Sequence, residues 1–382
     1  MDLRYGTNPH QQARIVAAIN DPVRVVHGAP SMINWLDALN AWQLVYEAHS
    51  ATGLPAAASF KHVSPAGAAI AGAIDDTMRE TWVLANDTVG ALAGAYVRAR
   101  DADPKSSFGD MIAVSEPVDD ELAGVLARVV SDGIIAPGYA PGTVAALSRK
   151  KNGQFLILQA NPNYEPPAWE CRDVFGVPLE QQRDTAPLTT DLLRVIEGPA
   201  LSPLQISDAL LGMVTARYTQ SNTVVYVKGG MAVGIAAGQQ SRVDATTLAG
   251  RKATTWWRRR HPAIHRLALP ATSGRQERLN WQIRVAENEM TPTQQETLAS
   301  LVGTGDMGFN HAERSAWDSR LTGLTMVSDG YVPFRDNIDH AATGGVTCVI
   351  EPGGSTRTSE VQDACAELGI TLVHTGTRLF HH

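Results

Sequence analysis

A lysine and a histidine stand next to each other where a predicted buried strand ends. Residues 56–60 are small or apolar and predict the strand, and Lys61 and His62 follow directly. In α/β folds the carboxyl ends of strands border the ligand crevice. A histidine, with an unperturbed pKa of about 6.5, exchanges a proton near neutrality, and a lysine supplies positive charge. The pair is therefore a candidate for acid–base chemistry, although two exposed loop residues are the commoner explanation of such a dipeptide.

Several other polar segments lie beside predicted strands. In the N-terminal arm, residues 3–12, Arg4 offers a bidentate guanidinium for a phosphate or a carboxylate, although most such arms fray. A glycine turn at residues 352–355 precedes a predicted helix, and the backbone donors of a helix start can bind an anion. Many such turns bind nothing, so this segment alone is a weak signal. The remaining polar segments are residues 103–110, 219–222, 236–242 and 328–337.

The elements around these segments alternate between strands and helices. Apolar residues at helical spacing predict a helix over residues 32–50, which Gly53 and Pro55 end. Residues 223–235 predict a hairpin with a glycine turn, and the small residues 68–73 predict a tightly packed helix. The alternation is typical of a three-layer α/β arrangement. The other expected strands cover residues 111–114, 152–160, 324–327, 346–350 and 370–373. The other expected helices cover 121–130, 206–218, 337–343, 359–368 and parts of 270–324.

Size and composition indicate a globular protein of two domains. The chain has 382 residues, too many for one ordinary core. Hydrophobic residues make up 44% and charged residues 19% of it, which excludes a disordered chain. No apolar run approaches the roughly 20 residues of a membrane span, and the N-terminus lacks the apolar stretch of a signal peptide. A cytoplasmic protein is expected, and no internal repeat of short period is found.

Charge and cysteine content exclude further classes. The formal net charge of -7 argues against nucleic acid as the main partner but is compatible with a small anionic ligand. Residues 256–261, Trp-Trp-Arg-Arg-Arg-His, predict a helix end with solvated arginines around buried tryptophans. The three cysteines lie far apart and form no CxxC, so buried free thiols are expected instead of disulfides or a zinc site.

Taken together, these blocks resemble a known family. They are similar to the formyltransferase portion of the bifunctional purine-biosynthesis enzymes, 5-aminoimidazole-4-carboxamide ribonucleotide (AICAR) transformylase. The matching blocks keep the order of the family and span essentially the whole chain. They are residues 3–6, 8–11, 37–42, 59–67, 106–110, 131–139, 218–222, 238–242, 334–337 and 378–382.

The resemblance implies an α/β fold of two cytidine-deaminase-like three-layer α/β/α subdomains. The first would comprise residues 1–172 plus 260–322, and the second residues 173–259 plus 323–382. The resemblance also implies a homodimer with active sites at the subunit interface and no nucleic-acid or membrane partner. No catalytic metal is implied, in agreement with the lack of the His-x-Glu and Pro-Cys-x-x-Cys motifs of zinc deaminases. The resemblance leaves open whether the protein binds a structural monovalent cation.

The implied reaction is formyl transfer from 10-formyltetrahydrofolate, as co-substrate, to the 5-amino group of AICAR in de novo purine (IMP) biosynthesis. By resemblance, His62 is the base on this weakly nucleophilic amine, Lys61 stabilises the transition state and supplies a proton, and Asn222 orients the carboxamide and formyl groups. The implied nucleotide contacts are Arg4, Tyr5, Asn34, Gly109, Asp132, Arg242, Val332 and Arg378, and the implied folate contacts are Val243, Asn337, Thr356 and Arg357.

Two departures from the family pattern leave alternatives open. The family usually carries an aromatic pair where this chain has Tyr331 and Val332, so the stacking contact is either lost or supplied by Tyr331. The usual N-terminal cyclohydrolase domain does not precede the matched blocks, so ring closure is expected on another polypeptide. A paralogue acting on a related aminoimidazole is one alternative. A non-catalytic nucleotide- or folate-binding paralogue is another, which the presence of Lys61, His62 and Asn222 disfavours.

Overall fold

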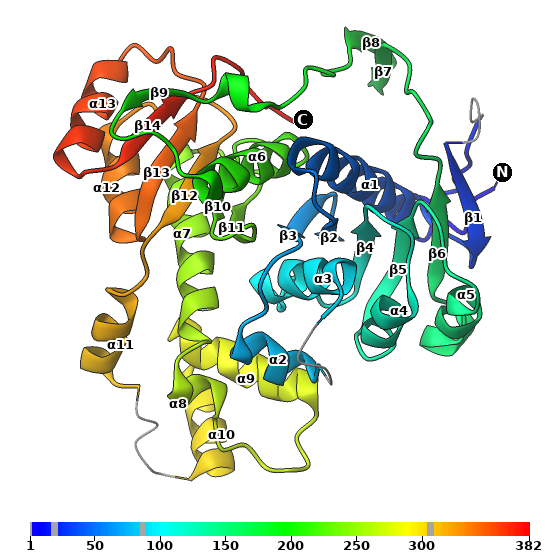
Figure 1. The fold of residues 1–382 in the computed structure, drawn as a ribbon. Coiled ribbons are helices and arrows are strands. Elements are labelled where there is room, and N and C mark those ends of the chain that lie inside the picture. The colour runs from blue at the N-terminus through cyan, green and yellow to red at the C-terminus, as the bar shows by residue number, and fades with distance from the viewer. Residues whose placement is uncertain (1, 17–21, 85–88, 304–308) are drawn as a thin grey trace.

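The computed structural model describes residues 2–16, 22–84, 89–303 and 309–382, which form two six-stranded sheets and one small hairpin (Figure 1). The strand order of the first sheet is β1-β6-β5-β4-β2-β3. Strands β4, β5 and β6 are parallel, β1 is antiparallel to β6, and β2 and β3 form an antiparallel hairpin at the other edge. The strands are β1 (Val23–His27), β2 (Ala56–Lys61), β3 (Ser64–Ile70), β4 (Asp110–Val114), β5 (Ser131–Ala136) and β6 (Leu156–Ala160).

The second sheet repeats this topology. Its strand order is β11-β10-β12-β13-β14-β9, with β12, β13 and β14 parallel, β9 antiparallel to β14, and β10 and β11 forming the edge hairpin. Two copies of one α/β unit thus follow each other along the chain, a repeat too long and too diverged to be found as a short sequence period. The strands are β9 (Arg194–Glu197), β10 (Val224–Val227), β11 (Ala232–Ala236), β12 (Leu324–Ser328), β13 (Val346–Glu351) and β14 (Thr371–His374).

Helices cover both faces of each sheet. Alternate residues of β2 point to opposite faces: Ala58 packs in the core with α1 (Met32–Thr52), and Ala57 packs in the core with α3 (Ala91–Ala102). In the second sheet the corresponding helices are α6 (Pro203–Arg217) and α7 (Arg242–Arg258). Helices α1 and α6 also pack against each other and lie side by side in Figure 1. The predicted three-layer α/β/α fold class is confirmed.

The two sheets meet at their hairpin edges. Ala69 of β3 forms an isolated antiparallel bridge with Met231, just before β11, and the backbone N–H of Ile70 donates to Gly230 O at 3.0 Å. The other elements are α2 (Asp76–Trp82), α4 (Asp120–Leu126), α5 (Thr143–Leu147), η1 (Lys150–Gly153), β7 (Trp169–Val174), β8 (Val177–Gln182), η2 (Thr190–Leu192), α8 (Pro262–His265), α9 (Arg275–Glu287), α10 (Pro292–Val302), α11 (His311–Asp318), α12 (Arg335–Thr343) and α13 (Thr358–Glu367).

The helical excursion expected within residues 270–324 is confirmed by α9, α10 and α11, which lie between α7 and β12 in the chain. The proposed division of the chain into subdomains at residues 172, 259 and 322 stays a prediction. No helix in the described ranges is long and apolar enough to cross a membrane.

The predicted helix over residues 68–73 is wrong. The first part of this segment completes strand β3, and the glycine just before it allows α3 to pack closely on the sheet. A Cβ atom at Gly67 would lie 2.0 Å from Ala99 O of α3, so only glycine allows this approach. The second unit repeats the contact, because a Cβ atom at Gly234 would lie 2.1 Å from Ala249 O of α7.

The prediction of solvated arginines within residues 256–261 is also wrong for Arg259 and Arg260. Arg259 is 2% exposed and pairs with Asp101 of α3 at 2.7 Å. Arg260 pairs with the second oxygen of Asp101 and with Asp75, both at 2.8 Å. The buried Asp101 carboxylate needs these cations, and together they connect α3 to the end of α7.

The cysteines are free thiols, as expected, but only two are buried. Cys348 and Cys365 lie in the core of the second unit. Cys171 is exposed on strand β7, so burial of all three was an incorrect prediction.

Candidate functional site

The Lys61–His62 pair lies in a tight turn. Lys61 pairs with Ser64 across the β2–β3 hairpin, which leaves His62 and Val63 as a two-residue loop. Both loop residues have left-handed backbone conformations, with φ of 55° and 60°. Hairpins of this length favour positive φ at both positions and therefore asparagine or glycine, whereas a β-branched residue such as valine is strained there. The turn presents the His62 side chain to solvent.

Lys61 and His62 lie at the end of a strand, as predicted. The expectation that they lie beside the carboxyl ends of the parallel strands is wrong. Strand β2 runs antiparallel to β4, so its carboxyl end lies beside the amino ends of β4 and β5. Lys61 Nζ donates there to Phe108 O at 3.0 Å and to Gly109 O at 2.9 Å. Asp132, the second residue of β5, lies at the same end of the sheet.

The N-terminal arm and the start of α1 reach this end of the sheet as well. Strand β1 is antiparallel to β6, so the chain enters α1 beside the amino ends of the parallel strands. Met32 N–H donates to Tyr5 O at 3.2 Å, and Arg4 Nη2 donates to the Tyr5 hydroxyl at 3.0 Å. Asn34 accepts from the backbone N–H of Ser31 at 3.0 Å as part of a capping box. The structure thus brings seven of the predicted residues to one sheet end: Arg4, Tyr5, Asn34, Lys61, His62, Gly109 and Asp132.

Two residues at this end were not predicted to be in the site. Asp37, in α1, accepts from the backbone N–H of Val63 at 2.6 Å. Burial raises the pKa of its carboxyl, opposed by that hydrogen bond and by the charges of His62 and Lys61. Lys151 forms a 2.6 Å ion pair with Asp132. Asp37 lies three residues after Asn34, so helical spacing was a usable signal, whereas nothing local marks Lys151.

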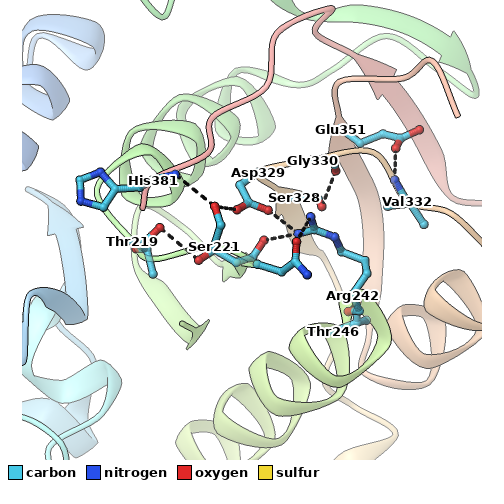
Figure 2. A network of polar contacts seen from close by, with 12 residues as sticks. Thr219, Ser221, Arg242, Thr246, Ser328, Asp329, Gly330, Val332, Glu351 and His381 are labelled. Carbon is cyan, nitrogen blue, oxygen red and sulfur yellow. Dashed lines mark hydrogen bonds and ion pairs between the residues drawn. The ribbon is translucent and has the colours of Figure 1, made fainter. Parts of the chain in front are cut away.

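A second group of predicted residues lies at the carboxyl ends of β12, β13 and β14. Arg242 Nη2 donates to Asn222 Oδ1 at 2.9 Å, and its Nη1 donates to Thr223 O at 2.8 Å and pairs with Asp329. Figure 2 shows the side chains of Ser221, Arg242 and Asp329 directed toward one another. The Arg242 side chain is 8% exposed and the Asp329 side chain is fully buried, so this guanidinium is held by the protein itself.

The C-terminal segment is docked onto the same network. Leu379 N–H donates to Asp329 O at 2.8 Å, and Ser221 N–H donates to His381 O at 3.0 Å. His381 N–H in turn donates to Ser221 Oγ at 3.1 Å (Figure 2). Arg378 is exposed beside the ring of Phe380, 5.1 Å from its centroid. Docking therefore places Arg378 at this sheet end, where a frayed terminus would not.

Tyr331 and Val332, which stand where the family usually carries an aromatic pair, differ in their exposure to solvent. Val332 is fully buried, and its backbone N–H donates to the Glu351 carboxylate (Figure 2). Tyr331 is 46% exposed, so of these two residues it is the one available for contact with a ligand. Burial raises the pKa of Glu351 to about 7, and its Oε1 lies 3.1 Å from Nε2 of His374.

The predicted folate residues differ in their accessibility. Asn337 is fully buried and accepts from Thr246 Oγ1 at 3.1 Å. Thr356 and Arg357 are exposed before α13, with the guanidinium of Arg357 5.1 Å from the ring centroid of Phe334. The second group comprises Asn222, Arg242, Val243, Val332, Asn337, Thr356, Arg357 and Arg378. Within the described residues, no hydrogen bond or ion pair joins this group to the group around Lys61.

No cluster of three or more His, Cys, Asp or Glu side chains that could hold a metal ion occurs in the described part of the chain. The fold and the two groups define a duplicated α/β/α protein with polar side chains gathered at the ends of its sheets. A family model described as the AICARFT/IMPCHase bienzyme matches residues 1–252. The chain belongs to this family, and the resemblance drawn from its sequence is confirmed.

Three relatives illustrate the similarity, each called bifunctional purine biosynthesis protein PurH. Those of Ruegeria sp. (strain TM1040) and Dinoroseobacter shibae are 32% identical to this chain, and that of Roseobacter denitrificans is 31% identical. Each similarity covers 100% of this chain but 59% of the relative. The chain thus spans under two thirds of the length of these relatives.

Proposed function

We propose that this protein transfers the formyl group of 10-formyltetrahydrofolate to the 5-amino group of AICAR, in purine biosynthesis. The observation that carries the proposal is the turn at Lys61 and His62, which presents an imidazole to solvent beside a fixed ammonium group. Membership of the AICARFT/IMPCHase family supports the choice of reaction.

In the proposed reaction the amine nitrogen of AICAR attacks the formyl carbon of the folate. A new C–N bond forms, the carbonyl becomes a transient oxyanion, and the bond to the folate nitrogen then breaks. His62 accepts the proton from the attacking amine, and Lys61 stabilises the oxyanion and donates a proton to the leaving nitrogen. The products are the formamido nucleotide and tetrahydrofolate.

The position of Lys61 suits this role. An ammonium group has three N–H donors, and two of these are directed at Phe108 O and Gly109 O. These two contacts fix Nζ beside the turn, and the third donor is left for the substrate. Holding both substrates in register against such fixed groups supplies much of the rate.

We assign the nucleotide to the exposed arginines and the rigid polar groups of both sheet ends. Arg4 and Arg378 are exposed and suit the phosphate, since a guanidinium binds it bidentately. The Arg242 guanidinium donates a hydrogen bond to Asn222 Oδ1 within the protein. In the proposed site it orients the Asn222 amide, which faces the carboxamide and formyl groups of the substrates. The exposed ring of Tyr331 supplies the stacking contact in place of the buried residue that follows it.

We assign the folate to the region of Val243, Asn337, Thr356 and Arg357. Val243 is half-buried at the start of α7, and Thr356 and Arg357 are exposed at the turn before α13. Asn337 is buried, so it would act by holding the start of α12. No metal takes part in the proposed chemistry. The proposal leaves open whether the protein binds a structural monovalent cation.

We also propose a homodimer with active sites at the subunit interface. The hairpin of β7 and β8 supports it, because this hairpin lies apart from both sheets in Figure 1 and exposes apolar side chains. A two-stranded hairpin is marginally stable alone, and an exposed apolar patch marks an interaction surface. The exposed apolar residues are Trp169, Val174, Phe175, Val177 and Leu179. A cytoplasmic location without nucleic-acid or membrane partners remains part of the proposal.

The deciding experiment mixes the purified protein with AICAR and 10-formyltetrahydrofolate and follows the release of tetrahydrofolate. Release that requires both AICAR and an intact His62 supports the proposal. Absence of release from a folded protein that still binds the folate would defeat the AICAR assignment and favour a related aminoimidazole as the amine.

A further inference from the structure

The duplicated fold allows the turn at His62 to be compared with its counterpart in the second unit. The counterpart is the β10–β11 turn, where Lys228 and Met231 are paired by backbone hydrogen bonds of 2.9 and 3.2 Å. Its two loop residues are Gly229 and Gly230, with φ of 58° and 76°. Lys228 therefore corresponds to Lys61, and the two glycines correspond to His62 and Val63.

The surroundings of the two turns correspond as well. A glycine with left-handed conformation precedes the next strand in each unit, Gly109 before β4 and Gly323 before β12. The lysine of each turn reaches this position: a Cβ atom at Gly109 would lie 3.1 Å from Lys61 Nζ, and one at Gly323 would lie 3.4 Å from Lys228 Nζ.

Each turn is also held by one carboxylate from the helix beneath it. Asp208 accepts from the backbone N–H groups of Gly229 and Gly230 at 3.0 and 2.5 Å. Asp37 accepts from the N–H of Val63 at 2.6 Å. Asp37 is the sixth residue of α1, counted from Met32, and Asp208 is the sixth residue of α6, counted from Pro203.

We propose that Asp37 is a positioning residue that holds the turn of His62 and Val63 in its left-handed conformation and so aims Lys61 and His62 at the substrate. The inference rests on the proposed function. In the second unit two glycines adopt the same conformation without steric cost. In the first unit the loop residues carry side chains, since one of them must be the base, and the hydrogen bond from Val63 to Asp37 opposes the resulting strain.

The two carboxylates form a matched pair for the test. Asp37→Ala removes the acceptor from the turn that carries His62, and Asp208→Ala removes the equivalent acceptor from the turn that carries only glycines. We expect Asp37→Ala to lower kcat about 100-fold with little change in KM, because the catalytic groups are misaimed by roughly an ångström. Asp208→Ala should lower the unfolding temperature at least as much but leave kcat unchanged, and Asp37→Asn, which keeps an oxygen acceptor, should retain most of kcat.

A rescue variant separates positioning from general loss of stability. In the Asp37→Ala protein, Val63→Gly should restore a large part of kcat, because glycine adopts the left-handed conformation without help. Wild-type kcat in Asp37→Ala would overturn the proposal. Parallel losses of kcat and stability in Asp37→Ala and Asp208→Ala, with no rescue, would also overturn it.

Hydrogen–deuterium exchange provides a readout that does not depend on the reaction. Exchange in a peptide covering residues 58–66 should rise in Asp37→Ala and stay unchanged in Asp208→Ala; unchanged exchange in both would contradict the inference. If the unmodified protein transfers no formyl group, the proposed function fails by itself, and this exchange comparison still decides whether Asp37 holds the turn.

Discussion

Arg242 Nη2 lies 2.9 Å from Asn222 Oδ1, and the same guanidinium pairs with the buried carboxylate of Asp329. The amide proposed to orient the substrates is thus fixed by a buried ion pair. Asp329 also accepts from Ser221 Oγ at 2.5 Å and, through its backbone carbonyl, from Leu379 N–H at 2.8 Å. The orientation of Asn222 therefore depends on the docked C-terminal segment.

Replacement of Asp329 should destabilise the protein strongly. Asp329→Ala leaves the buried Arg242 charge unpaired, which costs about 3–5 kcal/mol of unfolding free energy. Urea denaturation measures this loss, and kcat of the surviving folded protein should fall with it. The control is Glu289→Gln, whose pair with Arg251 is 61% exposed on both sides and should be worth under about 1 kcal/mol. Equal effects of the two substitutions would contradict this account.

His62→Ala should abolish most of the activity without harming the fold. The side chain is exposed, so its removal costs little stability, while the loss of a general base lowers kcat by roughly 10²–10⁴-fold. Single-turnover formyl transfer and the thermal unfolding curve measure the two effects. His311→Ala, at an exposed position of α11, is the matched control and should change neither. Full activity in the His62 variant would remove this residue from the mechanism.

Glu351 should make stability depend on pH. Burial raises the pKa of its carboxyl from 4.5 to about 7, so between these values the folded chain keeps a proton that the unfolded chain has released. This stabilisation is complete below about pH 4.5 and is lost as the pH rises toward 7. Glu351→Gln removes the titration, so from pH 5 to pH 8 its stability should rise relative to the parent protein by up to about 3 kcal/mol.

Denaturation of both proteins across this pH range tests the effect. His374, whose pKa burial lowers, acts in the opposite direction but is present in both proteins. Parallel stability curves for the parent protein and Glu351→Gln would show that Glu351 ionises normally in the folded state.

The aromatic contact to the nucleotide should come from Tyr331. Tyr331→Ala should weaken AICAR binding by about 1–3 kcal/mol, the usual contribution of base stacking, with an unchanged fold. Val332→Phe should instead overpack the site beneath it and lower the unfolding free energy by about 1–3 kcal/mol. Calorimetric titration with AICAR and urea denaturation distinguish the two effects. Tighter AICAR binding by Val332→Phe would show that the buried position can open to the ligand.

Self-association should depend on the β7–β8 hairpin. Phe175, at its tip, is fully exposed in the isolated chain, and Phe175→Asp should place a charge in the proposed dimer contact. Sedimentation velocity over a range of concentrations should then show a shift from dimer to monomer. Leu204→Asp, an exposed apolar position on α6, serves as the control and should leave the dimer intact. A parent protein that is monomeric throughout would reject the homodimer itself.

Local sequence patterns predicted most of the elements but failed where packing overrides them. The bounds of α1 agree closely with the helix expected from the sequence. The apolar spacing begins after Ser31, and the left-handed Gly53 ends the helix. Residues 68–73 were misassigned, because the first three pair with β2 as part of strand β3. The preceding Gly67 admits α3 against the sheet, a long-range contact that no local window contains. The arginines after Trp256 were expected in solvent for the same reason, since their partner Asp101 is far away in the chain.

The sequence by itself determined the family, the α/β class and the identities of the candidate catalytic residues, because these depend on residue types in a fixed order. Only the tertiary structure decided where they lie. The direction of β2 places Lys61 at the amino ends of the parallel strands. Docking of the C-terminus through Leu379 and Asp329 places Arg378 at the carboxyl ends of the second sheet. Comparison of the two units shows that Asp37 and Asp208 hold equivalent turns. Each of these relationships joins residues distant in sequence, and pairing, burial and charge compensation arise only once the chain has folded.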